Sequence, residues 1–304
     1  MVSWTGEQII TVGDERLRLL RTGPPRGRPV VLLWGGLGSV ASDWDAVLTR
    51  LDPALQMVWI EVIASGSDWV RTPVRRRAQA ILIAAETLRL QPPYLLAGHS
   101  LGGLYVQGFA RLHPALTAGL LLVDSTLTEA QEAHRTEPSG MSTDGRPGRL
   151  LAATLAAASL GLRHPGPIPL FASAVRRLVV WGNTVRGSDP LPLARSRDSY
   201  GDPALLLTIL RDWAQSSNAA NDLRQIAADH PLPDVPLTVL AGSRRGRPIS
   251  RPDRRWLAAQ RHLSQQVPGG RFVAVPDAAH LVMLDRPDTV TTALHQLLDD
   301  HRRQ

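Results

Sequence analysis

A serine flanked by glycines follows a short apolar run in residues 94–103, whose sequence is YLLAGHSLGG. Gly98 and Gly102 stand two residues before and two residues after Ser100, which is the G-x-S-x-G pattern of a sharp strand-to-helix turn. Small residues are needed at both places because backbone segments nearly touch there. The turn would raise the Ser100 hydroxyl beside a helix N-terminus, where negative charge is favoured. The segment therefore predicts a serine nucleophile.

The alternative is an ordinary strand-to-helix turn in which the serine has no chemical role. The residues around Ser100 distinguish between the two interpretations. An apolar run of strand length precedes Gly98, and residues 104–112 can continue as a helix until His113-Pro114 ends it. This context favours the nucleophile, because the pattern is informative only between a strand and a helix.

A serine nucleophile needs a base that titrates near neutrality, and His280 is the best placed of the nine histidines. It follows the apolar segment 271–275, so it lies just past a predicted strand, where a loop can reach back to Ser100. The other histidines occupy the variable place in the serine pattern, helix ends, late helices or the middle of the chain. They are His99, His113, His134, His164, His230, His262, His295 and His301.

Apolar segments of strand length alternate with helical segments along most of the chain, which predicts an α/β fold with a mostly parallel central sheet and helices on both faces. Candidate side chains should meet at the carboxyl ends of the strands. A leading hairpin is predicted at 8–12 and 17–21, further strands at 29–33, 57–62, 94–97, 118–123, 236–241 and 271–275, and helices at 43–51, 73–90, 104–112, 252–266 and 287–300.

The alternation stops between Thr126 and Pro233, where apolar helical segments are separated by Pro/Gly-rich pieces. We therefore expect one core built from residues 1–125 and 234–304, with residues 126–233 forming a helical cap or lid insertion.

Composition excludes several classes of protein. The chain has 304 residues, 43% of them hydrophobic, and no cysteine, which rules out disulfides, thiolate metal sites and a cysteine nucleophile. The net charge of +7 comes from scattered arginines without a single lysine, and no nucleic-acid motif accompanies them. The apolar stretch 150–162 is too short to span a bilayer, and residues 1–18 lack a signal pattern. We expect a cytoplasmic protein without a membrane span or anchor that does not bind nucleic acid.

The chain resembles the α/β-hydrolases, and closely the actinobacterial serine hydrolases that share a G-H-S-L-G-G-L-Y segment around the nucleophile. The resemblance rests on three features in order: the glycine turn at 34–38, the segment around Ser100, and His280 after the last strand. It covers nearly the whole chain outside 126–233. It implies the α/β-hydrolase fold and a hydrolase that works without a cofactor or metal.

The resemblance also implies two backbone donors for the oxyanion of an acyl-transfer intermediate. One is the N–H of Leu101, directly after the nucleophile, and the other comes from Gly36 or Leu37. Trp34 stands where most relatives have a histidine before the glycines. Gly36 is also compatible with a plain turn that plays no part in the chemistry.

The carboxylate that should orient His280 is less well defined by the sequence. Most relatives carry it about three residues past the glycine that corresponds to Gly242, and this chain has Arg245 there. Asp124 is the best candidate because it ends a predicted strand at the same sheet edge, where some relatives carry their acid. Asp253 is the second candidate, and a serine–histidine pair without an acid is the third possibility.

Two functions follow from these features. The first is a serine hydrolase that cleaves a carboxylic ester, thioester or lactone of a small apolar substrate through an acyl-enzyme. The pocket would be formed by the apolar insertion with Trp181, Tyr200 and Trp213. Epoxide hydrolases and haloalkane dehalogenases use aspartate in place of Ser100, which argues against their chemistry. The second function is ligand binding or a non-hydrolytic, cyclase-like step. It is suggested by Trp34, Arg245 and a departure from the family pattern after Glu61. The sequence does not indicate the oligomeric state.

Overall fold

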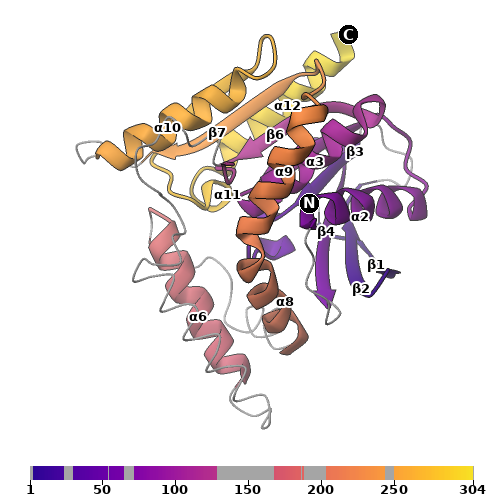
Figure 1. The fold of residues 1–304 in the computed structure, drawn as a ribbon. Helices are drawn as coiled ribbons and strands as arrows, with labels where there is room; N and C mark the ends of the chain where they lie inside the picture. Colours follow the sequence, from indigo (N-terminus) through magenta and orange to yellow (C-terminus); the bar gives the residue numbers. More distant parts are fainter. Residues whose placement is uncertain are drawn as a thin grey trace.

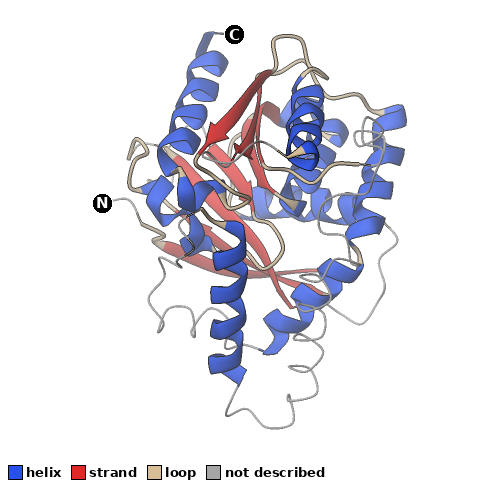
Figure 2. Cartoon of the chain, turned by 90° about the vertical axis from the view of Figure 1, so that its left-hand side faces the viewer, coloured by secondary structure: helices blue, strands red, loops and turns tan. Residues whose placement is uncertain are grey.

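The computed structural model describes residues 3–23, 30–53, 55–64, 72–128, 168–185, 187, 203–243 and 250–303. Within these ranges the chain forms one eight-stranded sheet with helices on both of its faces (Figures 1 and 2). The predicted α/β class is confirmed, and so is the mostly parallel sheet. None of the described helices is long and apolar enough to cross a bilayer.

The strand order is β1-β2-β4-β3-β5-β6-β7-β8. The first two strands form the predicted antiparallel hairpin, β2 pairs antiparallel with β4, and the remaining pairs are parallel. The central strands β3, β5 and β6 are buried along their whole length, as their continuous apolar sequences predict. The strands are β1 Gly6–Val12, β2 Glu15–Arg21, β3 Val30–Trp34, β4 Gln56–Ala64, β5 Tyr94–His99, β6 Thr117–Val123, β7 Leu237–Ser243 and β8 Arg271–Pro276.

Two apolar layers hold the helices to the sheet. Buried side chains of α2, α3, α9 and α10 pack against one face, and those of α1, α11 and α12 pack against the other. The helices of the first layer are α2 Pro73–Thr87, α3 Leu101–Leu112, α9 Ser216–Asp229 and α10 Arg251–Ser264. Those of the second layer are α1 Asp45–Leu48, α11 Val282–Asp285 and α12 Pro287–Arg303.

Two of the departures from the predicted helix ranges have a local cause. The segment predicted as one helix over 43–51 is a 3₁₀ turn, η1 (Ala41–Trp44), followed by the single turn α1. The carboxylate of Asp43 accepts the N–H of Val40 at 3.0 Å, which holds the tight turn at the start. Helix α2 ends at Thr87 instead of residue 90, because Arg89 takes a positive φ of 52° that no α-helix continues through.

The described parts of the predicted insertion are helical. They are α6 (Ile168–Asn183), α8 (Pro203–Ala214) and α9, and the apolar stretch 150–162 lies outside the described residues. Figure 1 shows α6 standing away from the sheet, whereas α9 lies against the core. The Asp222 carboxylate of α9 accepts the N–H groups of Val74 and Arg75 at the start of α2, at 2.8 and 3.0 Å. Helix α9 thus belongs to the layer that covers the sheet, and the boundaries of the insertion stay a prediction.

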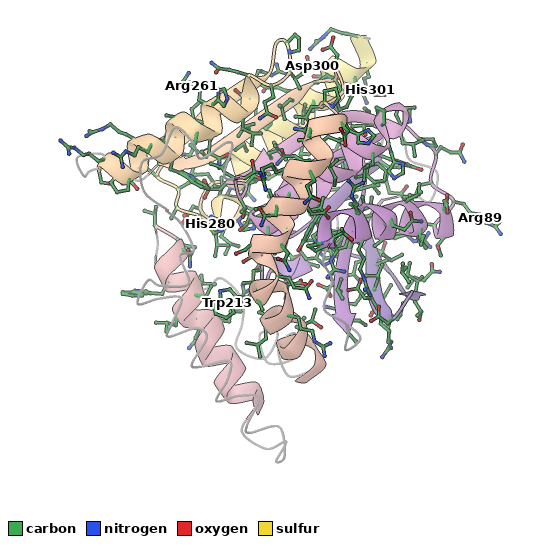
Figure 3. The ribbon with its side chains drawn as sticks, in the orientation of Figure 1. Arg89, Trp213, Arg261, His280, Asp300 and His301 are labelled. Carbon is green, nitrogen blue, oxygen red and sulfur yellow. The ribbon has the colours of Figure 1, made fainter. Side chains whose placement is uncertain are left out.

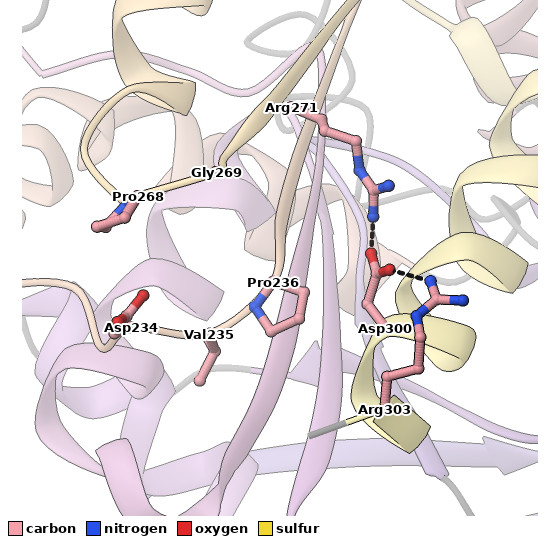
Figure 4. A pocket seen from close by; sticks show the side chains of 8 residues that line it. All are labelled: Asp234, Val235, Pro236, Pro268, Gly269, Arg271, Asp300 and Arg303. Carbon is pink, nitrogen blue, oxygen red and sulfur yellow. Dashed lines mark hydrogen bonds and ion pairs between the residues drawn. The ribbon is translucent and has the colours of Figure 1, made fainter.

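A cavity of about 320 Å³ lies at the amino ends of β7 and β8, between the turn 234–236 and the turn 268–269 (Figure 4). Arg271 and Arg303 both form ion pairs with Asp300 beside it. Ser100 follows the carboxyl end of β5, so this cavity is at the opposite edge of the sheet from the predicted nucleophile.

Candidate active site

Ser100 occupies the sharp turn between β5 and α3 that the sequence predicts. Its φ of 52° lies in a region that residues with a side chain rarely adopt. The flanking glycines are required by close approach, since a Cβ on Gly98 would lie 2.7 Å from the Gly102 oxygen and a Cβ on Gly102 would collide with the Trp34 and Gly35 oxygens. The strained turn presents the Ser100 hydroxyl at the carboxyl edge of the sheet.

His280 reaches Ser100 from the loop that follows β8, the position given by the sequence (Figure 3). Its Nε2 lies 3.0 Å from the Ser100 Oγ. The loop is fixed on both sides of the histidine: the Ala279 N–H donates to the Asp285 carboxylate at 2.9 Å, and the Leu281 N–H donates to the Asn183 oxygen at 3.0 Å. The imidazole is 30% exposed, so one side of it remains accessible.

Asp124 completes the constellation at the end of β6. Its Oδ2 lies 2.6 Å from His280 Nδ1, and its Oδ1 accepts the Gly242 N–H at 3.1 Å and the Trp256 Nε1–H at 3.0 Å. The side chain is 6% exposed, and these three hydrogen bonds satisfy both of its oxygens. The structure does not bring Asp253 to His280, because Asp253 is exposed and hydrogen-bonds Ser250 at the start of α10.

The three side chains form a directed chain of proton donors and acceptors. An ionised carboxylate only accepts, so the bond to Asp124 places the imidazole proton on Nδ1 of His280. Nε2 then carries a lone pair toward the Ser100 hydroxyl. This arrangement can take a proton from Ser100 and stabilise the resulting imidazolium, which is what nucleophilic attack by a serine requires.

The turn after β3 lies next to Ser100. A Cβ on Gly36 would come 2.7 Å from the Ser100 Cβ, so residue 36 has to be a glycine. The Gly36 N–H is already engaged, because it donates to the Ser39 Oγ at 3.1 Å. The N–H of Leu37 has no acceptor within the described part of the chain. Of the two alternatives predicted for this turn, Leu37 is the one with a backbone donor left for a ligand.

Trp34 replaces a histidine of the family pattern without entering the space around Ser100. Its indole packs edge to face against Tyr105 at 5.6 Å between centroids, and the Arg77 guanidinium lies 5.8 Å from both rings. The side chain is 6% exposed and belongs to the core. The departure at Trp34 is therefore a change of core packing beneath the turn.

Glu61 marks the second departure, and the structure places it inside β4, which continues to Ala64. Burial raises the pKa of the Glu61 carboxyl, although Arg18 and the Trp59 Nε1–H, 2.7 Å away, act in the opposite direction. The rest of this segment (65–71) and Arg245 lie outside the described residues. Glu61 lies within the predicted strand 57–62, and the observed strand continues two residues further, to Ala64.

Helix α6 is joined to the 3₁₀ turn η1 and to the histidine loop by polar contacts. Arg176 pairs with Asp43 at 2.7 Å, and both side chains are less than 5% exposed. Two residues after the C-terminal end of α6, the Val185 N–H donates to the Asp285 carboxylate at 3.0 Å. The same carboxylate also accepts the Ala279 N–H. Sequence reasoning missed Arg176 and Asp285, as well as Trp256, because nothing in their local pattern distinguishes them from ordinary helix residues.

Metal ligands are not grouped in the described part of the chain. No three side chains of His, Asp or Glu there are arranged to hold a metal ion. The constellation around Ser100 instead consists of a hydroxyl, an imidazole, a carboxylate and backbone N–H groups.

Comparison with known sequences identifies two similarities. A sequence model described as the alpha/beta hydrolase family matches residues 30–293. A curated protein from Hormonema carpetanum named "Probable transporter efuK" is 30% identical over 132 residues, which are 40% of this chain and 18% of that protein. The chain thus spans less than a fifth of the length of that relative.

Comparison with solved structures finds the same fold over nearly the whole chain. A "putative epoxide hydrolase" from Pseudomonas aeruginosa is similar with a TM-score of 0.69 and 19% identity, over 98% of this chain and 96% of that one. A thermophilic esterase from Thermogutta terrifontis has a TM-score of 0.63 and 20% identity, over 98% of this chain and 99% of that one. At these identities the likeness establishes the fold alone.

Proposed function

The chain belongs to the alpha/beta hydrolase family, and from this premise we propose that it is a serine hydrolase which cleaves a carboxylic ester, thioester or lactone through an acyl-enzyme on Ser100. The observation that carries the proposal is the uninterrupted contact from Ser100 Oγ through the His280 ring to the Asp124 carboxylate, at 3.0 and 2.6 Å. Both distances are within hydrogen-bond reach, as nucleophile activation by a histidine requires.

In the first half-reaction, the Ser100 Oγ attacks the substrate carbonyl carbon and His280 Nε2 takes its proton. Asp124 holds the Nδ1–H and stabilises the imidazolium. The tetrahedral intermediate collapses when its bond to the leaving oxygen or sulfur breaks and His280 returns the proton to that atom. The acyl group then remains on Ser100 Oγ.

In the second half-reaction, water attacks the acyl carbon and gives a proton to His280 Nε2. The bond to Ser100 Oγ breaks, and His280 returns the proton to the serine, so an acid is released and the enzyme is regenerated. The N–H groups of Leu101 and Leu37 would bind the oxyanion in both halves. Leu101 qualifies because the first N–H groups of a helix have no partner within it, and Leu37 because its N–H has no acceptor in the described part of the chain.

An apolar substrate is supported by side chains that α8 brings toward the turn after β3. A Cβ on Gly38 would lie 3.6 Å from the Ile209 Cδ1, so α8 contacts this turn directly. Figure 3 shows Trp213 on the side of α8 that faces α6, below His280. Apolar walls with a few polar groups are typical of small-molecule sites. Tyr200, the third aromatic residue of the predicted pocket, lies outside the described residues.

A fluorophosphonate probe tests the proposal. The Ser100 Oγ should displace fluoride and form a phosphonate ester, so the intact protein gains the probe mass. Ser100→Ala should not react, and Ser250→Ala, which removes the exposed serine that precedes α10, should react like the wild type. A series of 4-nitrophenyl esters of increasing acyl length would then define the preferred acyl group.

Two other functions make different predictions in the same assay. A binding protein or a cyclase-like protein with this fold would bind ligand without ester turnover, and absence of labelling in a folded sample would favour it. The epoxide hydrolase named among the structural neighbours raises a third function. Ser100 argues against it, since the family resemblance associates that chemistry with an aspartate at this position. Turnover of an epoxide but of no ester would overturn our proposal.

A further inference from the structure

His99, which the sequence places at the variable position before the nucleophile, is buried against His280. It is the last residue of β5, and only 1% of its surface is exposed. The centroids of the two imidazole rings are 4.8 Å apart, with an angle of 46° between their planes. The side chain next to the nucleophile in sequence is therefore also next to the proposed base in space.

One nitrogen of His99 holds the backbone of the histidine loop. Nε2 lies 3.0 Å from the carbonyl oxygen of His280. A carbonyl oxygen only accepts hydrogen bonds, so the proton of the His99 ring must be on Nε2. This bond fixes the tautomer and leaves Nδ1 with an unprotonated lone pair.

The other nitrogen of His99 faces the turn after β3. Nδ1 is buried and has no hydrogen-bond partner in the described part of the chain. It faces the backbone of Gly36, where a Cβ would lie only 2.8 Å away. A proton on Nδ1 would be buried without an acceptor, which is costly. The geometry therefore favours a ring that stays neutral.

The electrostatic surroundings act in the same direction. Burial, together with the neighbouring His280, lowers the pKa of His99 well below its ordinary value, while the hydrogen bond to the His280 oxygen opposes the shift. His280 is the titratable group that faces the ring from the loop after β8, and Asp124 stands behind it at the end of β6. On the side of the turn after β3 the ring meets Gly36, which carries no charge.

The main chain around His280 is held at three points, and His99 supplies the central one. The Ala279 N–H is bound by Asp285 and the Leu281 N–H by the Asn183 oxygen. Both of these partners lie outside the turn that carries Ser100. His99 is covalently joined to Ser100, so its bond links the position of the base to the position of the nucleophile.

We propose that His99 is a positioning residue: as a permanently neutral Nε2–H donor to the His280 carbonyl, it fixes the His280 imidazole at hydrogen-bond distance from the Ser100 hydroxyl. Gly36 provides the space that the ring needs. The inference deepens the proposed serine hydrolase function and rests on it for its catalytic consequence. Its structural part, the tautomer and the charge of His99, holds for the folded protein whether or not the enzyme turns over an ester.

Nuclear magnetic resonance of the ¹⁵N-histidine-labelled wild-type protein tests the structural part directly. We expect the His99 signals, assigned by their loss in His99→Gln, to show an Nε2–H tautomer that takes up no proton between pH 5 and pH 9. Titration within this range, or a proton on Nδ1, would overturn the proposal. The measurement requires no turnover, so it separates failure of this inference from failure of the proposed function.

Steady-state kinetics test the catalytic part. His99→Phe removes the donor, and we expect kcat to fall about 10²-fold with KM within two-fold, because a misplaced catalytic group costs about that much. His99→Gln retains an N–H donor and should recover most of the rate. His113→Gln, a half-buried histidine that packs on Phe109 at the far end of α3, is the matched control and should behave like the wild type. An unchanged kcat in folded His99→Phe would refute the positioning role. If His99→Phe does not fold, a fall in the kcat of His99→Gln as large as 10²-fold would refute it.

Discussion

The two edges of the sheet are built differently. At the carboxyl edge, Ser100, Asp124 and Asp277 all have positive φ angles, of 52°, 43° and 55°. Among the described residues, the remaining non-glycine residue with positive φ is Arg89, which follows the end of α2. At the amino edge, the cavity beside Asp300 is bordered by proline and glycine turns and by arginines that are already paired (Figure 4).

Unfavourable local features mark the candidate site at the carboxyl edge of the sheet. Each residue in a sparsely populated backbone region costs roughly 1–3 kcal/mol and persists only when the surrounding structure enforces it. Two such residues, Ser100 and Asp124, contact His280, and the third, Asp277, precedes it by three positions in the chain. The Nδ1 of His99, which has no partner in the described part of the chain, lies in the same region. The cavity at the amino edge contains no comparable feature in its described lining, where Arg271 and Arg303 are both paired with Asp300.

The largest expected difference between the edges is in turnover. Asp124→Asn should lower kcat by about 10⁴-fold, because the amide no longer favours the Nδ1–H tautomer of His280. Asp300→Asn removes a carboxylate at the amino edge and should leave kcat unchanged. The measurement is the rate of hydrolysis of one 4-nitrophenyl ester by both variants. A rate for Asp124→Asn within a few-fold of the wild type would contradict the assignment of the active site to the carboxyl edge.

A smaller effect should come from the support of Asp124. Trp256→Phe removes one of the two donors to Oδ1 and leaves the Gly242 N–H in place. A hydrogen bond to a charged group contributes about 1.5–3 kcal/mol, so kcat should fall at least about 10-fold. The same substitution should have little further effect in the Asp124→Asn background. Equal effects in both backgrounds would mean that Trp256 acts through packing and not through Asp124.

The sequence was sufficient for the fold and for the order of the site residues. Continuous apolar segments revealed each of the buried parallel strands, and parallel strands bring their carboxyl ends to one edge. The loops after β5, β6 and β8 therefore had to meet, which is why Ser100, Asp124 and His280 could be named together. The sequence ranked Asp124 above Asp253, and the geometry agrees with this ranking, because Asp124 lies 2.6 Å from His280 Nδ1 whereas Asp253 hydrogen-bonds Ser250.

The supporting contacts could not be predicted because they join residues that are distant in sequence. Trp256 reaches Asp124 across 132 positions, and Arg176 reaches Asp43 across 133. Neither contact leaves a periodic signal, since each involves a single side chain of an amphipathic helix. The preference for Leu37 over Gly36 depended on the Ser39 hydroxyl, whose direction is set by the local turn.

The strain at the carboxyl edge predicts a stability difference of about 1 kcal/mol. Ser100→Gly and Ser100→Ala both lack the hydroxyl, but only glycine adopts a positive φ without steric cost. The relief of roughly 1–3 kcal/mol is partly offset by the greater entropy of glycine in the unfolded chain. We expect Ser100→Gly to be the more stable variant in urea unfolding. A more stable Ser100→Ala would show that the turn carries no strain.

A further prediction concerns the pH dependence of stability. The folded protein lowers the pKa of His99, so below pH 6.5 the unfolded chain binds more protons at this residue than the folded protein does. The free energy of unfolding therefore falls as the pH falls, by up to about 1.4 kcal/mol per pH unit from one histidine. His99→Gln should flatten this fall relative to the wild type. Urea unfolding between pH 5 and pH 7.5 measures both slopes. If the free energy of unfolding of His99→Gln changed with pH as steeply as that of the wild type, His99 would gain its proton in the folded state. The ring beside His280 would then not be permanently neutral.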